Sequence, residues 1–119
     1  MSASSLLIII SSPPYAGTDR VWNALRLAET AVSSGTVTRV FLINDGVDTG
    51  RPAAAPPDVE YNLCAILTEL VDKGVSVRYC KTCIDRCGVG AGEMAPPLEV
   101  GSMKGLHQWI IESDRVVTF

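Results

Sequence analysis

The chain has 119 residues, of which 47% are hydrophobic and 19% charged, and its formal net charge is −3. This length predicts one core-rich domain over residues 1–119, and the negative charge without any basic run argues against nucleic-acid binding. The apolar run near the start is too short for a membrane span and lacks the positive charge of a signal peptide, so no membrane association is expected. Without an export signal we expect a cytoplasmic, reducing compartment, where the four cysteines indicate chemistry or core packing rather than disulfides.

The first third of the chain predicts a strand, a helix and a second strand. Residues 6–10 are continuously apolar, which is typical of a strand buried on both faces of a parallel sheet. A helix begins after Thr18 or Asp19 and ends at Gly35, and its apolar stripe consists of Val21, Trp22, Leu25, Ala28 and Val32. Residues 40–43 predict the second strand. It ends at a turn sequence that leaves Asp45 at the carboxyl end of a strand.

Two segments rich in proline and glycine predict loops. Residues 47–58 are long enough to form a flap over a site, and residues 90–97 predict a second flexible loop. Between them, residues 59–73 predict a helix that buries Leu63, Ile66, Leu67 and Leu70, with Cys64 on its core side.

The last part of the chain predicts a short strand, a helix and a terminal strand. The strands cover residues 98–100 and 115–119. Ser102 is expected to cap the helix, whose apolar side chains are Met103, Leu106, Trp109 and Ile110. His107, the only histidine, is expected on the solvent-facing side, which argues against a catalytic role.

A cluster of cysteines carries the strongest chemical signal. Residues 75–79 alternate as a strand does, and the next residues predict a short helix that ends at Gly88. Cys80 therefore lies where a strand ends and a helix begins, and free helix amides there stabilise a thiolate. We predict Cys80 as the nucleophile. Positive charge nearby is expected from Arg78, Lys81 and Arg86.

Two further thiols follow Cys80 at helical spacing. Cys83 is three residues later and lies on the same helix face, so we interpret it as a resolving thiol that attacks a persulfide on Cys80. Cys87 is four residues beyond Cys83. It extends this stripe as a third thiol or packs under the helix, and packing is the preferred interpretation.

The alternation of strands and helices predicts a three-layer α/β fold, with a mostly parallel sheet of about five strands and helices on both faces. In such sheets ligands bind at carboxyl ends of strands where the strand order reverses. A flavodoxin-like 2-1-3 order places that reversal between the first and third strands. The loop after the first strand, with Ser11, Ser12 and Tyr15, then faces Cys80 across one crevice.

The chain resembles the DsrE/TusD (DsrE/DsrF-like) group of small sulfur-relay proteins over nearly its whole length. The matching segments are residues 6–10 with the loop and helix that follow, 40–47, 77–83 and 101–119. The resemblance implies an α/β domain assembled as homotrimers or homohexamers, with a persulfide-carrying cysteine at the position of Cys80. One difference is that relatives often have a basic residue just before the glycine matching Gly88, where this chain has Cys87.

We therefore expect a sulfur carrier of the sulfurtransferase type, in which Cys80 takes sulfur from a donor and passes it to an acceptor protein or small thiol. No organic cofactor or metal is needed for this reaction.

Three alternatives remain open at this point. One is a dithiol redox protein, because residues 80–83 match the thioredoxin motif locally, although its usual aromatic residue and proline are absent. Another is a non-catalytic oligomeric binding or regulatory subunit. The third is a zinc or iron–sulfur site on Cys80, Cys83 and Cys87 that requires a fourth ligand.

Overall fold

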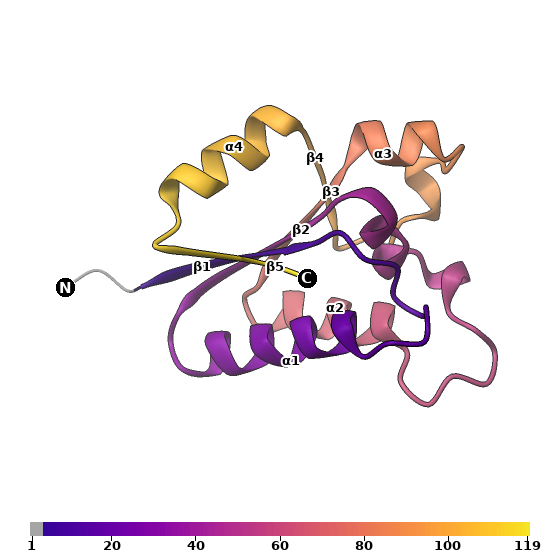
Figure 1. The fold of residues 1–119 in the computed structure, drawn as a ribbon, viewed down its shortest axis with the longest axis horizontal. Helices are drawn as coiled ribbons and strands as arrows, with labels where there is room; N and C mark the ends of the chain where they lie inside the picture. The colour runs from indigo at the N-terminus through magenta and orange to yellow at the C-terminus, as the bar shows by residue number, and fades with distance from the viewer. Residues whose placement is uncertain (1–3) are drawn as a thin grey trace.

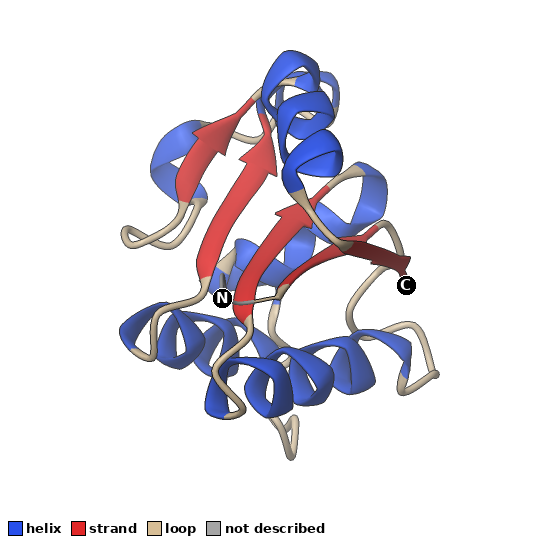
Figure 2. Ribbon diagram, turned by 90° about the vertical axis from the view of Figure 1, so that its left-hand side faces the viewer, coloured by secondary structure: helices blue, strands red, loops and turns tan. Residues whose placement is uncertain are grey.

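The protein is a parallel α/β sandwich, described here by a computed structural model of residues 4–119. Residues 1–3, which precede the apolar run compared with a signal peptide, lie outside the described residues. Five parallel strands form the sheet in the order β4-β3-β2-β1-β5, and Figure 2 shows their arrowheads pointing the same way. The strands are β1 (Ser5–Ile10), β2 (Val37–Leu42), β3 (Ser76–Cys80), β4 (Glu99–Gly101) and β5 (Arg115–Thr118).

Helices cover both faces of this sheet, which confirms the predicted fold class. Helices α1 (Arg20–Ser33) and α2 (Leu63–Asp72) lie on one face and α4 (Met103–Glu112) on the other, while α3 (Lys81–Arg86) follows the carboxyl end of β3 and contacts the segment after β2 (Figure 1). The interior strand β1, which lies between β2 and β5, buries Leu7, Ile8 and Ile10 completely, as its continuous apolar run predicts. Within residues 4–119, none of the helices has the length and apolar character that crossing a membrane requires.

The predicted 2-1-3 strand order is wrong, because β2 lies between β1 and β3. Helices α1 and α2 pack against each other on the same face of the sheet. Right-handed crossovers that run in one direction across a sheet place successive helices on one face, whereas the 2-1-3 order places them on opposite faces. The strand order reverses instead between β1 and β5, which pairs with β1 in parallel.

Helix α2 begins at Leu63, later than the predicted residue 59. Its first turn is fixed by two hydrogen bonds that the apolar pattern does not show. The Asn62 side chain accepts the N–H of Ala65 at 3.0 Å, and the Tyr15 hydroxyl accepts the N–H of Leu63 at 3.0 Å. These bonds satisfy amides that lack partners at a helix start. Residues 55–62 before them stay irregular.

Parts of the two predicted loops pack against the core. Residues Asn44–Gly50 form a 3₁₀ helix, η1, in which Val47, Thr49 and Gly50 are buried. A second short one, η2 (Pro52–Ala54), follows. The N–H of Ala95 donates to the Gly50 carbonyl at 2.8 Å, so this bond connects the 90–97 segment to η1. The expectation of a flap over residues 47–58 is therefore wrong for its first half, which belongs to the core.

Helix α4 is capped as predicted, since the Ser102 side chain accepts the N–H of Gly105 at 3.1 Å. It buries Leu106 and Trp109, while Met103 and Ile110 are 63% and 38% exposed. Only two of the four apolar residues expected on this helix are therefore in the core, because the contact with the sheet is narrower than their spread around the helix. The exposed residues leave apolar surface on α4.

Candidate functional site

Cys80 lies at the predicted junction between strand and helix. It is the last residue of β3 and the N-cap of α3, and its Sγ accepts the N–H of Cys83 at 3.4 Å. Side chains along β3 alternate between its two faces as predicted, with Val77 and Tyr79 buried and Arg78 between them half-buried. Cys80 itself is only 4% exposed. Its sulfur is thus held just beneath the surface.

Cys83 lies beside Cys80 and is the more accessible of the pair. Its Sγ accepts the backbone N–H of Asn44 at 3.3 Å, from the start of η1. Asn44 has a φ of 52°, in the left-handed region that asparagine tolerates better than most residues. This conformation directs its amide to the sulfur. Sequence reasoning missed Asn44, although an asparagine between a strand and an Asp-Gly turn is a signal for left-handed backbone.

The two sulfurs interact as a pair. Burial raises the pKa of the Cys83 thiol above its ordinary value, and so does the hydrogen bond that this thiol donates to the Cys80 sulfur. The Asn44 amide acts in the opposite direction, and the nearby Cys80 and Cys87 sulfurs raise the pKa further. Cys83 is therefore a thiol at neutral pH and a hydrogen-bond donor to its neighbour.

The other two cysteines differ from this pair and from each other. Cys64 is buried in the core as predicted, with 4% of its surface exposed, and burial raises the pKa of its thiol. Cys87 is exposed, so the preferred interpretation that it packs under the helix is wrong. Helix α3 ends at Arg86 and the chain turns at Gly88, whose φ is 71°, which leaves Cys87 beyond the last helical turn.

The three clustered cysteines do not converge. Among residues 4–119 there is no group of three or more His, Cys, Asp or Glu side chains placed to hold one metal ion. The geometry thus offers no set of three thiolates from Cys80, Cys83 and Cys87.

The basic residues predicted near Cys80 are largely engaged elsewhere. Lys81 forms an ion pair with Asp85, one helical turn later, at 2.7 Å. The Arg78 guanidinium stacks on Trp109 of α4 at 4.2 Å from the ring centroid. Arg86 is exposed in the last turn of α3. Positive charge next to the sulfur pair is therefore smaller than the sequence suggests.

The loop after β1 does not face Cys80, because β2 separates the two strands, and the prediction of one shared crevice is wrong. Ser11 Oγ donates to the Phe119 carbonyl at 3.1 Å, and Arg20 donates to Ser12 Oγ at 3.3 Å. Tyr15 supports the start of α2. Asp45 is exposed in η1. It follows Asn44, the residue whose N–H donates to Cys83.

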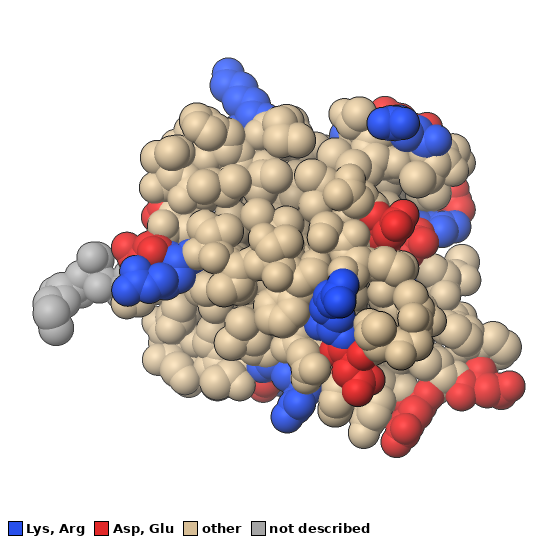
Figure 3. Space-filling model, viewed as in Figure 1, with Lys and Arg blue, Asp and Glu red and all other residues tan. Residues whose placement is uncertain are grey.

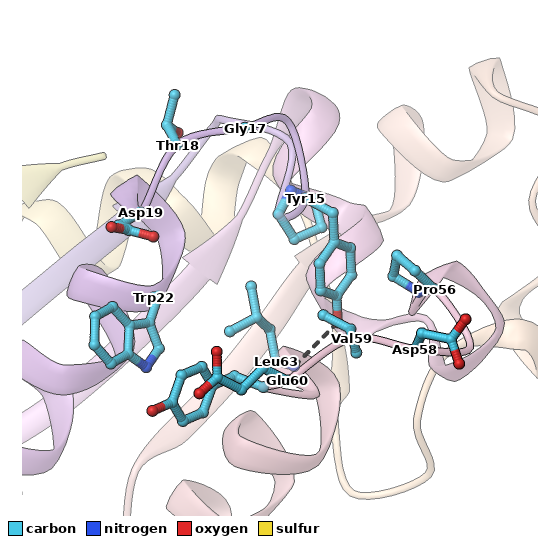
Figure 4. Close-up of a pocket in the computed structure, with 12 residues that line it drawn as sticks. Tyr15, Gly17, Thr18, Asp19, Trp22, Pro56, Asp58, Val59, Glu60 and Leu63 are labelled. Carbon is cyan, nitrogen blue, oxygen red and sulfur yellow. Dashed lines mark hydrogen bonds between the residues drawn. The ribbon is translucent and has the colours of Figure 1, made fainter.

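A separate groove of about 630 Å³ lies beside this loop (Figure 4). Its aromatic wall includes Trp22 and Tyr61, whose rings stack with centroids 5.2 Å apart. No cysteine lines it. The full lining is Pro14, Tyr15, Gly17, Thr18, Asp19, Trp22, Pro56, Asp58, Val59, Glu60, Tyr61 and Leu63.

Comparison with known proteins places this geometry in a family. The sequence model of the DsrE/DsrF-like family matches residues 4–119. The uncharacterized protein MK0008 of Methanopyrus kandleri is 33% identical over 96% of this chain and 93% of its own length. Protein YchN of Escherichia coli is also 33% identical, over 96% of this chain and 97% of its own length. The YchN crystal structure superposes with a TM-score of 0.86 over 98% of this chain and 99% of the other, at 31% identity.

One relative has a name that refers to sulfur chemistry. The sulfurtransferase TusD homolog of Pseudomonas aeruginosa is 29% identical over 94% of each chain.

Proposed function

The chain belongs to the DsrE/DsrF-like family, and from this premise we propose that it is a sulfur carrier that holds sulfane sulfur as a persulfide on Cys80. The observation that carries the proposal is the Cys80–Cys83 pair, in which each sulfur accepts a backbone N–H. Amide donors of this kind stabilise sulfur that carries negative charge. The likeness to a protein named as a sulfurtransferase supports the same chemistry at family level.

Loading requires no external oxidant. The Cys80 thiolate attacks the outer sulfur of a donor persulfide, a Cys80–sulfur bond forms, and the donor S–S bond breaks with its electron pair leaving on the donor thiolate. The backbone N–H and the thiol of Cys83 both donate to the Cys80 sulfur. Both donors therefore stabilise the negative charge on this sulfur before the transfer. Because Cys80 is only 4% exposed, small donors such as polysulfide reach it more readily than bulky ones.

Unloading follows the same chemistry in reverse. An acceptor thiolate attacks the outer sulfur of the Cys80 persulfide, takes it as a new persulfide, and leaves the Cys80 thiolate behind. Cys83 offers a second exit. Its thiolate attacks the Cys80 sulfur, forms a Cys80–Cys83 disulfide and releases hydrosulfide, so the sulfane sulfur is reduced as the two thiols are oxidised. The raised pKa of Cys83 makes this exit slow at neutral pH and favours transfer to an acceptor.

A dithiol redox function is the second candidate, and the contact between Cys80 and Cys83 favours it as well. All four cysteines are free thiols in the structure. We place either activity in a reducing cytoplasm, which keeps the pair reduced between reactions. The two functions differ in the product, since only the carrier retains an added sulfur atom.

We further propose that the chain forms a homotrimer or homohexamer. Support comes from exposed apolar side chains on α4 and on the edge strands, namely Met103, Ile110, Ile111, Val100 and Val116. Figure 3 shows few charged atoms over the part of the face that α4 occupies. Native mass spectrometry tests this directly, and a stable monomer at micromolar concentration contradicts it.

The experiment for the main proposal is sulfur loading followed by transfer. Wild-type, Cys80→Ser, Cys83→Ser and Cys87→Ser proteins are incubated with polysulfide, freed of excess reagent, and then mixed with a small thiol. We expect intact wild-type protein to gain about 32 Da, the mass of one sulfur atom, reversibly on reduction, and to return it to the thiol.

The serine variants separate the roles of the three thiols. Cys80→Ser is expected to gain nothing, while Cys87→Ser, the matched control with an exposed cysteine, loads like wild type. A loss of about 2 Da in place of the gain indicates a disulfide and the redox function. Loading that survives in Cys80→Ser contradicts the proposal.

A further inference from the structure

We propose that the groove beside Tyr15 docks a segment of a partner protein that carries arginine or lysine. The inference depends on the proposed function for one point only, namely that this partner exchanges sulfur with the Cys80–Cys83 pair. The groove itself is argued from its charges, its aromatic wall and its position.

Three carboxylates line the groove, and no lysine or arginine does. They are Asp19, Asp58 and Glu60. Figure 4 shows Asp19 on the side of α1 and Asp58 on the side of the 55–62 segment, while Figure 3 shows acidic atoms at the lower right, over that segment. Within residues 4–119, none of the three side chains forms an ion pair or a side-chain hydrogen bond.

The unpaired carboxylates of the groove differ from four others on the surface. Glu29, Asp48, Asp85 and Glu93 each meet a lysine or arginine of the same chain at 3.3 Å or less. A cation that enters the groove therefore gains ion pairs without breaking any internal one. Charge complementarity favours a positively charged occupant.

The aromatic wall favours the same occupant. Tyr61 is 47% exposed and stacks on Trp22 at an interplanar angle of 23°. Trp22 already binds one guanidinium outside the groove, because Arg26 lies 4.7 Å from its ring centroid and lines a separate hollow. Aromatic faces attract guanidinium and ammonium groups, and arginine more often than lysine. Aromatic rings with adjacent carboxylates thus form a receptor for a basic side chain.

The surroundings of the groove fit an extended segment better than a single small cation. A second hollow of about 250 Å³ shares Pro14 and Tyr15 with the groove and reaches Asp48 of η1. That 3₁₀ helix begins at Asn44, whose N–H donates to Cys83. A chain lying through both hollows therefore runs along the carboxyl edge of the sheet toward the element that contacts the thiols. A docked segment would therefore extend from the groove toward the thiols.

The test measures binding of a dye-labelled peptide in which arginine alternates with serine. A peptide in which glutamate alternates with serine is the control probe, and fluorescence anisotropy is followed at low and high salt. Wild-type protein is compared with Asp58→Asn/Glu60→Gln and with Tyr61→Ala. The matched control is Asp72→Asn/Glu99→Gln, which changes the net charge equally at exposed sites outside the groove.

We expect the arginine peptide alone to bind, and more weakly as salt rises. Affinity falls about fivefold in Asp58→Asn/Glu60→Gln, as for the loss of two exposed ion pairs. It falls about threefold in Tyr61→Ala, as for an exposed cation–π contact. The matched control binds like wild type. Equal losses in both double variants reduce the effect to net charge and overturn the proposal.

Two further arms keep the conclusions separate. If arginine amide displaces the peptide as effectively as unlabelled peptide does, the groove is a small-cation site and the docking proposal is wrong. Sulfur loading by inorganic polysulfide is measured on wild-type protein without any peptide. Failure of loading overturns the carrier function and leaves the peptide result to judge the groove, whereas failure of peptide binding overturns docking and leaves the carrier intact.

Discussion

The thiol end and the groove end of the molecule lie along the same edge of the sheet but are built in different ways. Cys80 and Cys83 lie within one turn of α3, and one distant amide, that of Asn44, completes their surroundings. The groove draws its walls from the loop after β1, the start of α1 and the 55–62 segment. Lys81, next to Cys80, is paired with Asp85, whereas the carboxylates of the groove form no ion pair.

This difference suggests a division of labour. The thiol end has a pair of hydrogen-bonded sulfurs, with Cys80 buried, which suits chemistry on a small sulfur species. The groove has open charge and exposed aromatic surface, which suits recognition of a larger partner. The segment between them is η1, which contacts both α2 and α3. Substitutions in η1 and at the thiol end test this contrast between the two regions.

The largest effect is expected from Gly46→Ala in η1. A methyl group at this position overlaps the carbonyl oxygen of Ile10, a backbone atom that has no room to move. We expect a loss of about 3 kcal/mol in the free energy of unfolding, at the upper end for overpacked sites. Urea denaturation measures it. Gly92→Ala is the matched control, since nothing lies within 4 Å of its added carbon. Equal stability of the two variants contradicts the placement of η1.

The next effect separates the two ends. Asn44→Val puts a β-branched residue at a φ of 52°, which costs about 1–2 kcal/mol and displaces the amide from Cys83. Since that amide lowers the pKa of Cys83, its loss raises the pKa further and slows alkylation of Cys83 near pH 8. Peptide binding at the groove stays unchanged.

Asn44→Gly keeps both the amide and the backbone conformation, so it is expected to behave like wild type. Mass-spectrometric mapping of iodoacetamide labelling follows Cys83 in each protein. If Cys83 is alkylated at the same rate in Asn44→Val and in Asn44→Gly, the Asn44 amide has no influence on the thiol.

A third expectation concerns alkaline pH. The pKa values of Cys64 and Cys83 are raised in the folded protein, so above the ordinary thiol value of about 8.5 the unfolded chain loses these protons first. The unfolded state then binds fewer protons, and stability falls as pH rises from that value through the folded pKa values. Thermal melts between neutral and alkaline pH, with reductant, measure this slope. Cys64→Ala is expected to start less stable and to show a shallower slope. An equal slope contradicts the assignment.

The smallest effect is expected at Lys81. Because its ammonium is paired with the exposed Asp85, Lys81→Gln costs at most about 0.5 kcal/mol of stability. Polysulfide loading changes by no more than about twofold, the equivalent of that energy. A much larger loss of loading shows that Lys81 acts on the sulfur directly, as its position in the sequence suggests.

Local signals in the sequence predicted much of this molecule. The apolar run of β1, the alternation before Cys80 and the cap at Ser102 each depend on residues that are close in the chain, and the structure has all three. The adjacency of Cys80 and Cys83 follows from helical spacing alone. These features need no knowledge of how distant segments meet.

Other features depend on distant contacts. The order of β1, β2 and β3 depends on which face α1 and α2 share, and their apolar stripes do not specify a face. The bond from Asn44 to Cys83 joins residues 39 positions apart. The stacking of Trp22 on Tyr61 likewise joins α1 to a segment that carries no regular pattern. The groove was therefore missed, and the loop that carries Ser11 and Ser12 was wrongly placed opposite Cys80.

The central claim is that sulfur is held on Cys80, and site mapping of polysulfide-treated wild-type protein tests it most directly. Persulfides are trapped by alkylation, the protein is digested, and each of the four cysteine sites is examined for an added mass of about 32 Da. The account predicts the added sulfur on the buried Cys80, and not on the exposed Cys87 or the core Cys64. Sulfur that follows exposure, with Cys87 labelled first and Cys80 unmodified, contradicts it.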